Sequence, residues 1–172
     1  MLESWFETVQ LWPSSVALRE SLYGYTLLLT LHVVSLTLFA GVVLVLDLRL
    51  TGLTFRNVRV SEVWSRMMLP WMTLGLLLNA GSGALLVYSN PMRYYVNFYF
   101  WVKAALFVIA GVNAIYFHLT LFKTVERWEH RDAFPTGARV AGLASVLLWS
   151  GVLVAGRLLA YEGLAPAWWL AD

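Results

Sequence analysis

Four long apolar segments, separated by short polar connections, dominate the chain. The first covers 15–48; between Glu20 and Asp47 it has no formally charged residue and a single histidine, His32. The other three are expected at 62–88, 95–123 and 138–161. Each exceeds the ~20 residues that an α-helix needs to cross a hydrocarbon core of ~30 Å. The pattern therefore predicts four transmembrane helices.

A shorter apolar pattern precedes the first segment. Leu2, Trp5, Phe6 and Val9 share one side of a helix that must end before Pro13. Aromatic residues on such a helix are typical of a segment that lies on the membrane surface. We therefore expect a short interfacial helix at the N-terminus, and no cleavable signal peptide.

The composition agrees with a membrane protein. Of the 172 residues, 60% are hydrophobic and 13% are charged, whereas soluble domains carry about 25% charge. This length holds one transmembrane domain, 1–172, without a separate soluble module. Short connections predict an all-α, antiparallel four-transmembrane-helix bundle in which the first and third spans lie on a diagonal.

The basic residues predict how the bundle lies in the membrane. Eight of the twelve Lys and Arg residues fall in the connections Asp47–Arg66 and Lys123–Arg139. Because basic connections stay in the cytoplasm, both termini are expected in the periplasm. The expected location is the bacterial inner membrane, with the lipid bilayer around the spans.

Several kinds of chemistry are excluded. The chain has no cysteine, which excludes disulfides, iron–sulfur clusters and thiolate metal sites. Its net charge of +2 is small and dispersed, so nucleic acid is not an expected partner. The sequence shows no His–carboxylate–nucleophile set and no phosphate-binding loop, so an independent hydrolase is not expected.

Two histidines, on the first and third spans, are the main candidates for cofactor binding. Neutral imidazole nitrogens bind haem iron well. On the third span, Gly111 and Ala114 precede His118 on the same helix face, and their small size suits a flat ligand. On the first span, Ser35 shares the face of His32. The pattern predicts haem b between these spans, with His32 and His118 as axial metal ligands.

The fourth span carries a cation, Arg157, which is costly at membrane depth unless it is paired. Guanidinium groups bind carboxylates well, so a haem propionate is one expected partner. The alternatives are that Arg157 extends toward the outer surface, or that it pairs with Glu162 or Glu20.

The depths of the two histidines differ. His32 is near the middle of its span, whereas His118 is about five residues inward of the midpoint between Lys103 and Lys123, a mismatch of about 10 Å. Two axial ligands of one iron must lie at nearly the same height. If haem binds, His32 is therefore expected to be the stronger ligand.

Structural roles are the alternative for most of these polar residues. Each histidine can simply hydrogen-bond to a serine, an asparagine or a carbonyl, and Asn79 and Asn113 are expected to bond each other or the histidines. Gly75, Asn79 and Gly83 are spaced four apart, which predicts a close approach of another helix. The aromatic run 94–101 indicates an interfacial belt rather than a quinone site.

Two methionines suggest a different metal. Met68 and Met72 are four apart near the depth of His118, and soft thioethers with an imidazole can hold Cu(I). Methionine is also an ordinary gap-filler in protein cores, which is the alternative here. His130, in a charged connection, is expected to be solvated.

Five stretches carry a family resemblance: LRESLYGYTLLLTLHVVSL, LDLRLTGL, RMMLPW, WVKAALFVIAGVNAIYFH and LLWSGVLVAGRLLAY. From Leu18 to Tyr161 the chain resembles a family of small four-helix bacterial inner-membrane proteins of unassigned function. More distantly, WVK…AGVNA…FH is similar to copper-resistance D-type domains and to b-type cytochrome bundles. That likeness implies haem or metal binding, with His32 and His118 as the matching positions.

These observations give one leading functional expectation and two alternatives. The leading one is a membrane-embedded b-type haem electron-transfer protein or subunit, passing electrons between a quinone pool and a periplasmic redox partner. The first alternative is a non-redox accessory subunit in a larger membrane complex or a homo-oligomer, since nine Trp, eight Tyr and nine Phe offer contact surface. The second is a copper-handling membrane protein.

Overall fold

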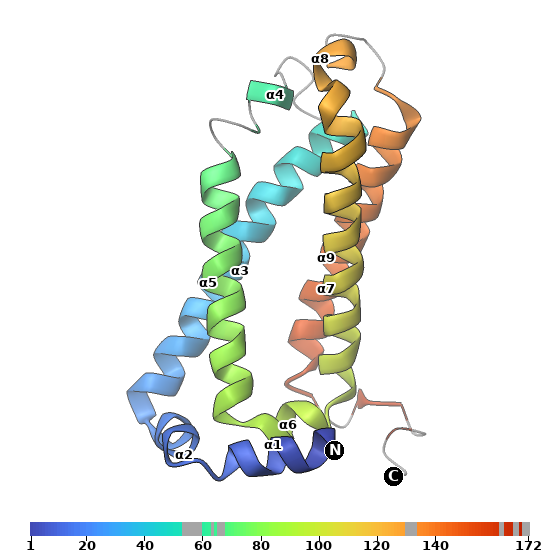
Figure 1. Ribbon diagram of the computed structural model, residues 1–172. Helices are drawn as coiled ribbons and strands as arrows, with labels where there is room; N and C mark the ends of the chain where they lie inside the picture. Colours follow the sequence, from blue (N-terminus) through green and yellow to red (C-terminus); the bar gives the residue numbers. More distant parts are fainter. Residues whose placement is uncertain are drawn as a thin grey trace.

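The computed structural model describes residues 1–52, 60–62, 64, 68–129, 134–161, 164–166 and 169, and these residues contain helices but no strand (Figure 1). The elements are α1 (Leu2–Gln10), α2 (Pro13–Glu20), α3 (Leu22–Thr51), α4 (Val60–Glu62), α5 (Leu69–Ser89), α6 (Pro91–Tyr95), α7 (Phe98–Tyr116), α8 (Val125–Trp128) and α9 (Thr136–Leu158). A π-helical turn, Phe117–Leu121, and a 3₁₀ turn, Phe122–Thr124, join α7 to α8.

Four of these helices are long and apolar enough to cross a membrane: α3, α5, α7 with its continuation to Trp128, and α9. The prediction of an all-α membrane bundle with four spans is therefore confirmed. The short helix expected before Pro13 is α1. Figure 1 shows α1, α2 and α6 lying across one end of the bundle, where α9 also ends.

The first two spans begin later than predicted. The first span does not begin at residue 15, because the chain bends at Ser21, whose side chain accepts a hydrogen bond from the N–H of Gly24 and caps α3. The second span begins at Leu69 rather than at residue 62, with Pro70 in its first turn, where a missing N–H costs no hydrogen bond.

The end of α3 corrects a third expectation. The polar connection was expected to start at Asp47, but the helix continues to Thr51 and is closed by Gly52 at φ 77°. Asp47 and Arg49 are therefore helical, and only 4% and 6% of their side chains are exposed. Arg49 lies over the ring of Phe134, 4.3 Å from the ring centroid. These two charged residues thus belong to the protein interior.

Glycines bring α3 close to two neighbours. A Cβ on Gly75 of α5 would lie 3.0 Å from the backbone nitrogen of Phe39, and one on Gly142 of α9 would lie 2.9 Å from Cβ of Leu50. The close approach predicted from the small residues of the second span is confirmed. These contacts hold α3 firmly against α5 and α9.

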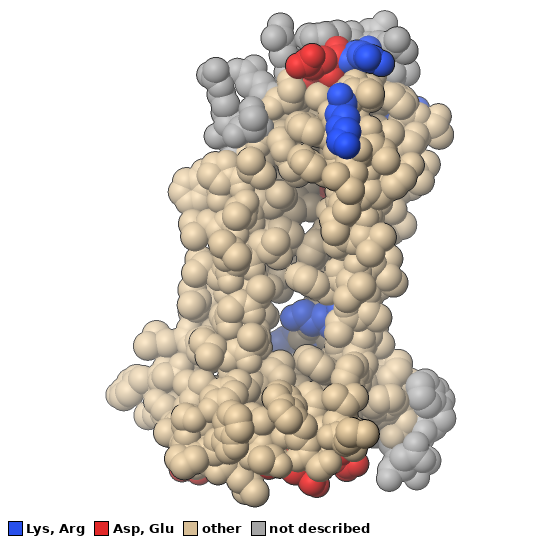
Figure 2. Space-filling model, viewed as in Figure 1, with Lys and Arg blue, Asp and Glu red and all other residues tan. Residues whose placement is uncertain are grey.

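The other side of the bundle is open. Helix α3 packs on α5 and α9, and α7 packs on α9, but α5 and α7 are not closely packed in the described part of the chain. The first and third spans lie on a diagonal, as predicted. Figure 2 shows the molecule hollowed between its two columns, with a basic side chain inside the lower hollow. This gap positions the candidate site.

Candidate functional site

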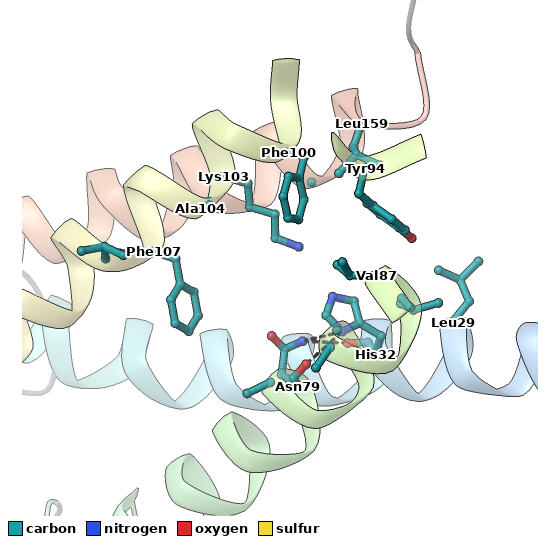
Figure 3. A pocket seen from close by; sticks show the side chains of 16 residues that line it. Leu29, His32, Asn79, Val87, Tyr94, Phe100, Lys103, Ala104, Phe107 and Leu159 are labelled. Atoms are coloured by element: carbon teal, nitrogen blue, oxygen red, sulfur yellow. Dashed lines mark hydrogen bonds between the residues drawn. The ribbon is translucent and has the colours of Figure 1, made fainter. Parts of the chain in front are cut away.

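A cavity of about 400 Å³ lies between the α3–α5 pair and α7. Figure 3 shows its principal lining residues: Leu29 and His32 from α3, Asn79 and Val87 from α5, Tyr94 from α6, and Phe100, Lys103 and Phe107 from α7. Val108 also lines it and is 64% exposed, so the cavity opens at the apolar surface of the bundle.

His32 is held in one orientation by helix α5. Its Nδ1 lies 3.1 Å from the backbone oxygen of Asn79 and 3.0 Å from Oγ of Ser82. In return, Nδ2 of Asn79 donates to the backbone oxygen of His32 at 3.0 Å, and Oγ of Ser35 donates to the same oxygen at 3.0 Å. The expected bond between Asn79 and a histidine is confirmed.

These contacts favour one tautomer of His32. The carbonyl oxygen of Asn79 can only accept, so a proton on Nδ1 satisfies the contact at 3.1 Å, whereas the amide Nδ2 of Asn79, which could donate to a bare Nδ1, lies further away at 3.4 Å. The other ring nitrogen, Nε2, then has a free lone pair, and Figure 3 shows that edge of the ring directed into the cavity. Gly83 makes room for the ring, because a Cβ there would lie 3.0 Å from Cε1 of His32.

Lys103 faces His32 across the cavity (Figure 3). It is partly buried, and within the described ranges its amine makes no hydrogen bond or ion pair. Gly156 of α9 leaves space for it, since a Cβ there would lie 3.4 Å from Nζ. An ammonium group without a partner is costly in a membrane span.

Tyr94 closes the end of the cavity nearest α1 and α6. Burial raises the pKa of Tyr94 above its ordinary value, and a hydrogen bond with Tyr25 of α3 acts in the same direction. The phenol therefore stays neutral and adds a hydroxyl group, without charge, to this end of the site.

His118 lies elsewhere. It is exposed on the π-helical turn, stacked on Phe122 with ring centroids 5.4 Å apart and 5.8 Å from the ring of Trp64, and it does not line the cavity. Helices α3 and α7 begin at the same end of the bundle. His118 lies 20 residues after the start of α7, whereas His32 lies 10 residues after the start of α3. The resulting depth difference is about 15 Å, so the structure does not bring the two histidines together.

The other predicted residues are dispersed. Arg157 is exposed, donates to the hydroxyl of Tyr161 at 3.0 Å, and does not line the cavity. Glu162, one of its expected partners, lies outside the described residues. Gly111 and Ala114 line a second cavity, on the α4–α8 side of the first. Of the residues expected to bind the cofactor, His32 lines the first cavity and Ser35 supports it.

The residues of the copper hypothesis occupy core positions. Met68 is buried with Val60 and Phe117, and Met72 packs against a separate cluster around Phe39. Among the described residues, no group of three or more His, Asp or Glu side chains could hold a metal ion. His130 lies outside the described residues.

Sequence reasoning missed Lys103 as a site residue and used it, with Lys123, only to estimate depth along the third span. A usable signal was its spacing: Lys103 falls three residues after Phe100 and four before Phe107, on the face of the third span already expected to meet a flat ligand. Asn113, expected to bond Asn79 or a histidine, instead donates to the backbone oxygen of Ala141 at 3.0 Å.

Comparison with known proteins identifies a family but no activity. The match is to DUF6644, a family of unknown function, over residues 14–162, so the chain belongs to that family. This agrees with the family of unassigned function expected from the sequence. No curated protein and no solved structure matches the chain.

Proposed function

We propose that this chain, a member of the DUF6644 family, is a membrane-embedded haem b protein that transfers electrons, and that His32 is the residue that would hold the iron. The observation that carries the proposal is the geometry of His32, whose Nδ1–H is bonded to a backbone carbonyl while Nε2 faces a cavity. Histidines that bind metals commonly donate their other ring N–H in this way, which fixes the ring and raises its basicity.

The cavity fits a flat apolar group with charged edges. Its volume of about 400 Å³ is within the range of cofactor sites, and its opening between α5 and α7 leaves room for the edge of a macrocycle. Phe100 and Phe107 supply aromatic walls. Lys103 would pair with a propionate, which accounts for an ammonium group without a partner among the described residues.

The bound haem would supply an iron that cycles between two oxidation states. The chain's own residues hold and shield it: Asn79 and Ser82 fix the imidazole, and apolar side chains limit water at the iron. On the predicted orientation, Lys103 and Tyr94 lie toward the periplasmic end, where a redox partner would approach.

An absorption spectrum of the purified protein tests the proposal. We expect a Soret band, reduced-minus-oxidised bands of haem b, and about one iron per chain. Protein expressed with ample haem supply that shows neither the Soret band nor iron would contradict the proposal. That result would favour the non-redox accessory subunit.

A further inference from the structure

The second cavity, of about 190 Å³, is lined by all four spans and adjoins the first, because Phe107 lines both. Three polar residues line it: Asp47 of α3, Asn113 of α7 and Ser145 of α9. The other described residues that line it are apolar or aromatic, and none of them is basic. It is therefore a largely apolar chamber containing one acid.

Asp47 is incompletely paired in this chamber. Its side chain is 4% exposed, and Ser145 hydrogen-bonds the carboxyl group. Its Oδ2 is buried and has no hydrogen-bond partner among the described residues. A buried oxygen that lacks a partner is costly, so a ligand that donates a hydrogen bond to Oδ2 would be stabilised there.

The size and walls of the chamber define that ligand. A dry cavity of about 150 Å³ can hold benzene, so about 190 Å³ accommodates one substituted six-membered ring. Phe39, Phe107 and Trp149 offer aromatic surfaces for such a ring. A hard metal cation instead requires six or more oxygen ligands, which these walls do not supply.

The ligand would arrive from the bilayer. Ala114 both lines the chamber and is exposed on α7, and α5 and α7 are not closely packed among the described residues. We propose that this chamber binds the ring of a membrane quinol, whose hydroxyl donates to Oδ2 of Asp47. That the quinol supplies electrons to haem rests on the proposed function, whereas its binding does not.

Filling the chamber tests the binding. Gly111 lines it, and a Cβ there would meet no atom within 4 Å, so Gly111→Leu places a side chain into open space. Gly81 of α5 is equally unobstructed but exposed, and it lines neither cavity. Gly81→Leu is therefore the matched control for folding and for added apolar bulk.

The measurement is equilibrium binding of decylubiquinol to purified protein in lipid nanodiscs. We expect Gly111→Leu to weaken binding more than tenfold, and Gly81→Leu to bind like the wild type. Equal affinity in the wild type and Gly111→Leu would overturn the proposal. An equal loss of decylubiquinol affinity in Gly111→Leu and Gly81→Leu would also overturn it, because such a loss would not depend on filling the chamber.

Asp47→Asn tests the hydrogen bond. Replacing one carboxyl oxygen by an amide NH₂ group, which donates rather than accepts, is expected to weaken decylubiquinol binding about tenfold. The oxidised form, decylubiquinone, has no hydroxyl to donate and should be affected less. Unchanged quinol affinity in Asp47→Asn would overturn the role of Asp47. Haem content is measured separately, so quinol binding without haem would contradict only the proposed function.

Discussion

Replacing His32 with alanine is expected to remove haem from the purified protein. The imidazole is the only histidine side chain that lines the larger cavity in the described part of the chain, and its Nε2 is the free nitrogen directed into it. Axial ligation supplies the specific bond between haem and protein, so Soret absorbance per chain should fall at least tenfold. The bundle should still fold, because the contacts of α3 at Gly75 and Gly142 are unchanged.

His118→Ala is the matched control for this prediction. His118 stacks on Phe122 near Trp64, about 15 Å from the depth of His32. Its replacement should leave haem content and the absorption maxima unchanged. Loss of haem in His118→Ala with retention in His32→Ala would contradict the assignment and move the site toward the α4–α8 end.

Replacing Lys103 with methionine is expected to lower haem occupancy about tenfold, since a charge-assisted hydrogen bond to a propionate is worth about 1.5–3 kcal/mol. Methionine retains most of the apolar stem and removes the cation. Lys103→Arg keeps the positive charge and should retain most of the haem. Occupancy is measured as Soret absorbance per chain after purification in the same detergent.

Arg157→Ala is the control for Lys103→Met, because it also removes a cation near the end of the bundle where α1 and α6 lie. Because Arg157 is exposed and bonded to Tyr161, its removal should leave haem occupancy unchanged. Equal haem loss in Lys103→Met and Lys103→Arg would contradict the role of propionate partner. That result would instead point to the amine of Lys103 as an iron ligand, since guanidinium does not replace it.

The spans could be predicted from the sequence because a membrane requires long, uncharged apolar helices, and hydropathy reports this directly. The close approach at Gly75 and the contact of Asn79 with His32 also followed from residue spacing. The break at Ser21 could not be predicted, because apolar residues continue across it and a capping side chain decides the bend.

The composition of the site was less predictable because it depends on which faces of the helices meet. On the third span, His118 lies 15 residues after Lys103 and does not line the cavity, whereas Lys103 faces His32. Charge alone suggested a polar connection at Asp47, but continuation of α3 buries this residue against α9, where Ser145 hydrogen-bonds its carboxyl group. The difference in depth between the two histidines, estimated from the sequence, already favoured His32 over His118 as the haem ligand.

Chemical rescue of His32→Gly tests the central claim most directly. Glycine leaves a space beside Asn79 and Ser82 in which free imidazole can take the place of the missing ring. We expect the variant to be purified without a haem b spectrum, and haem with imidazole to restore the wild-type absorption maxima. Failure of imidazole to change the spectrum, or a wild-type spectrum without imidazole, would show that His32 does not bind the iron.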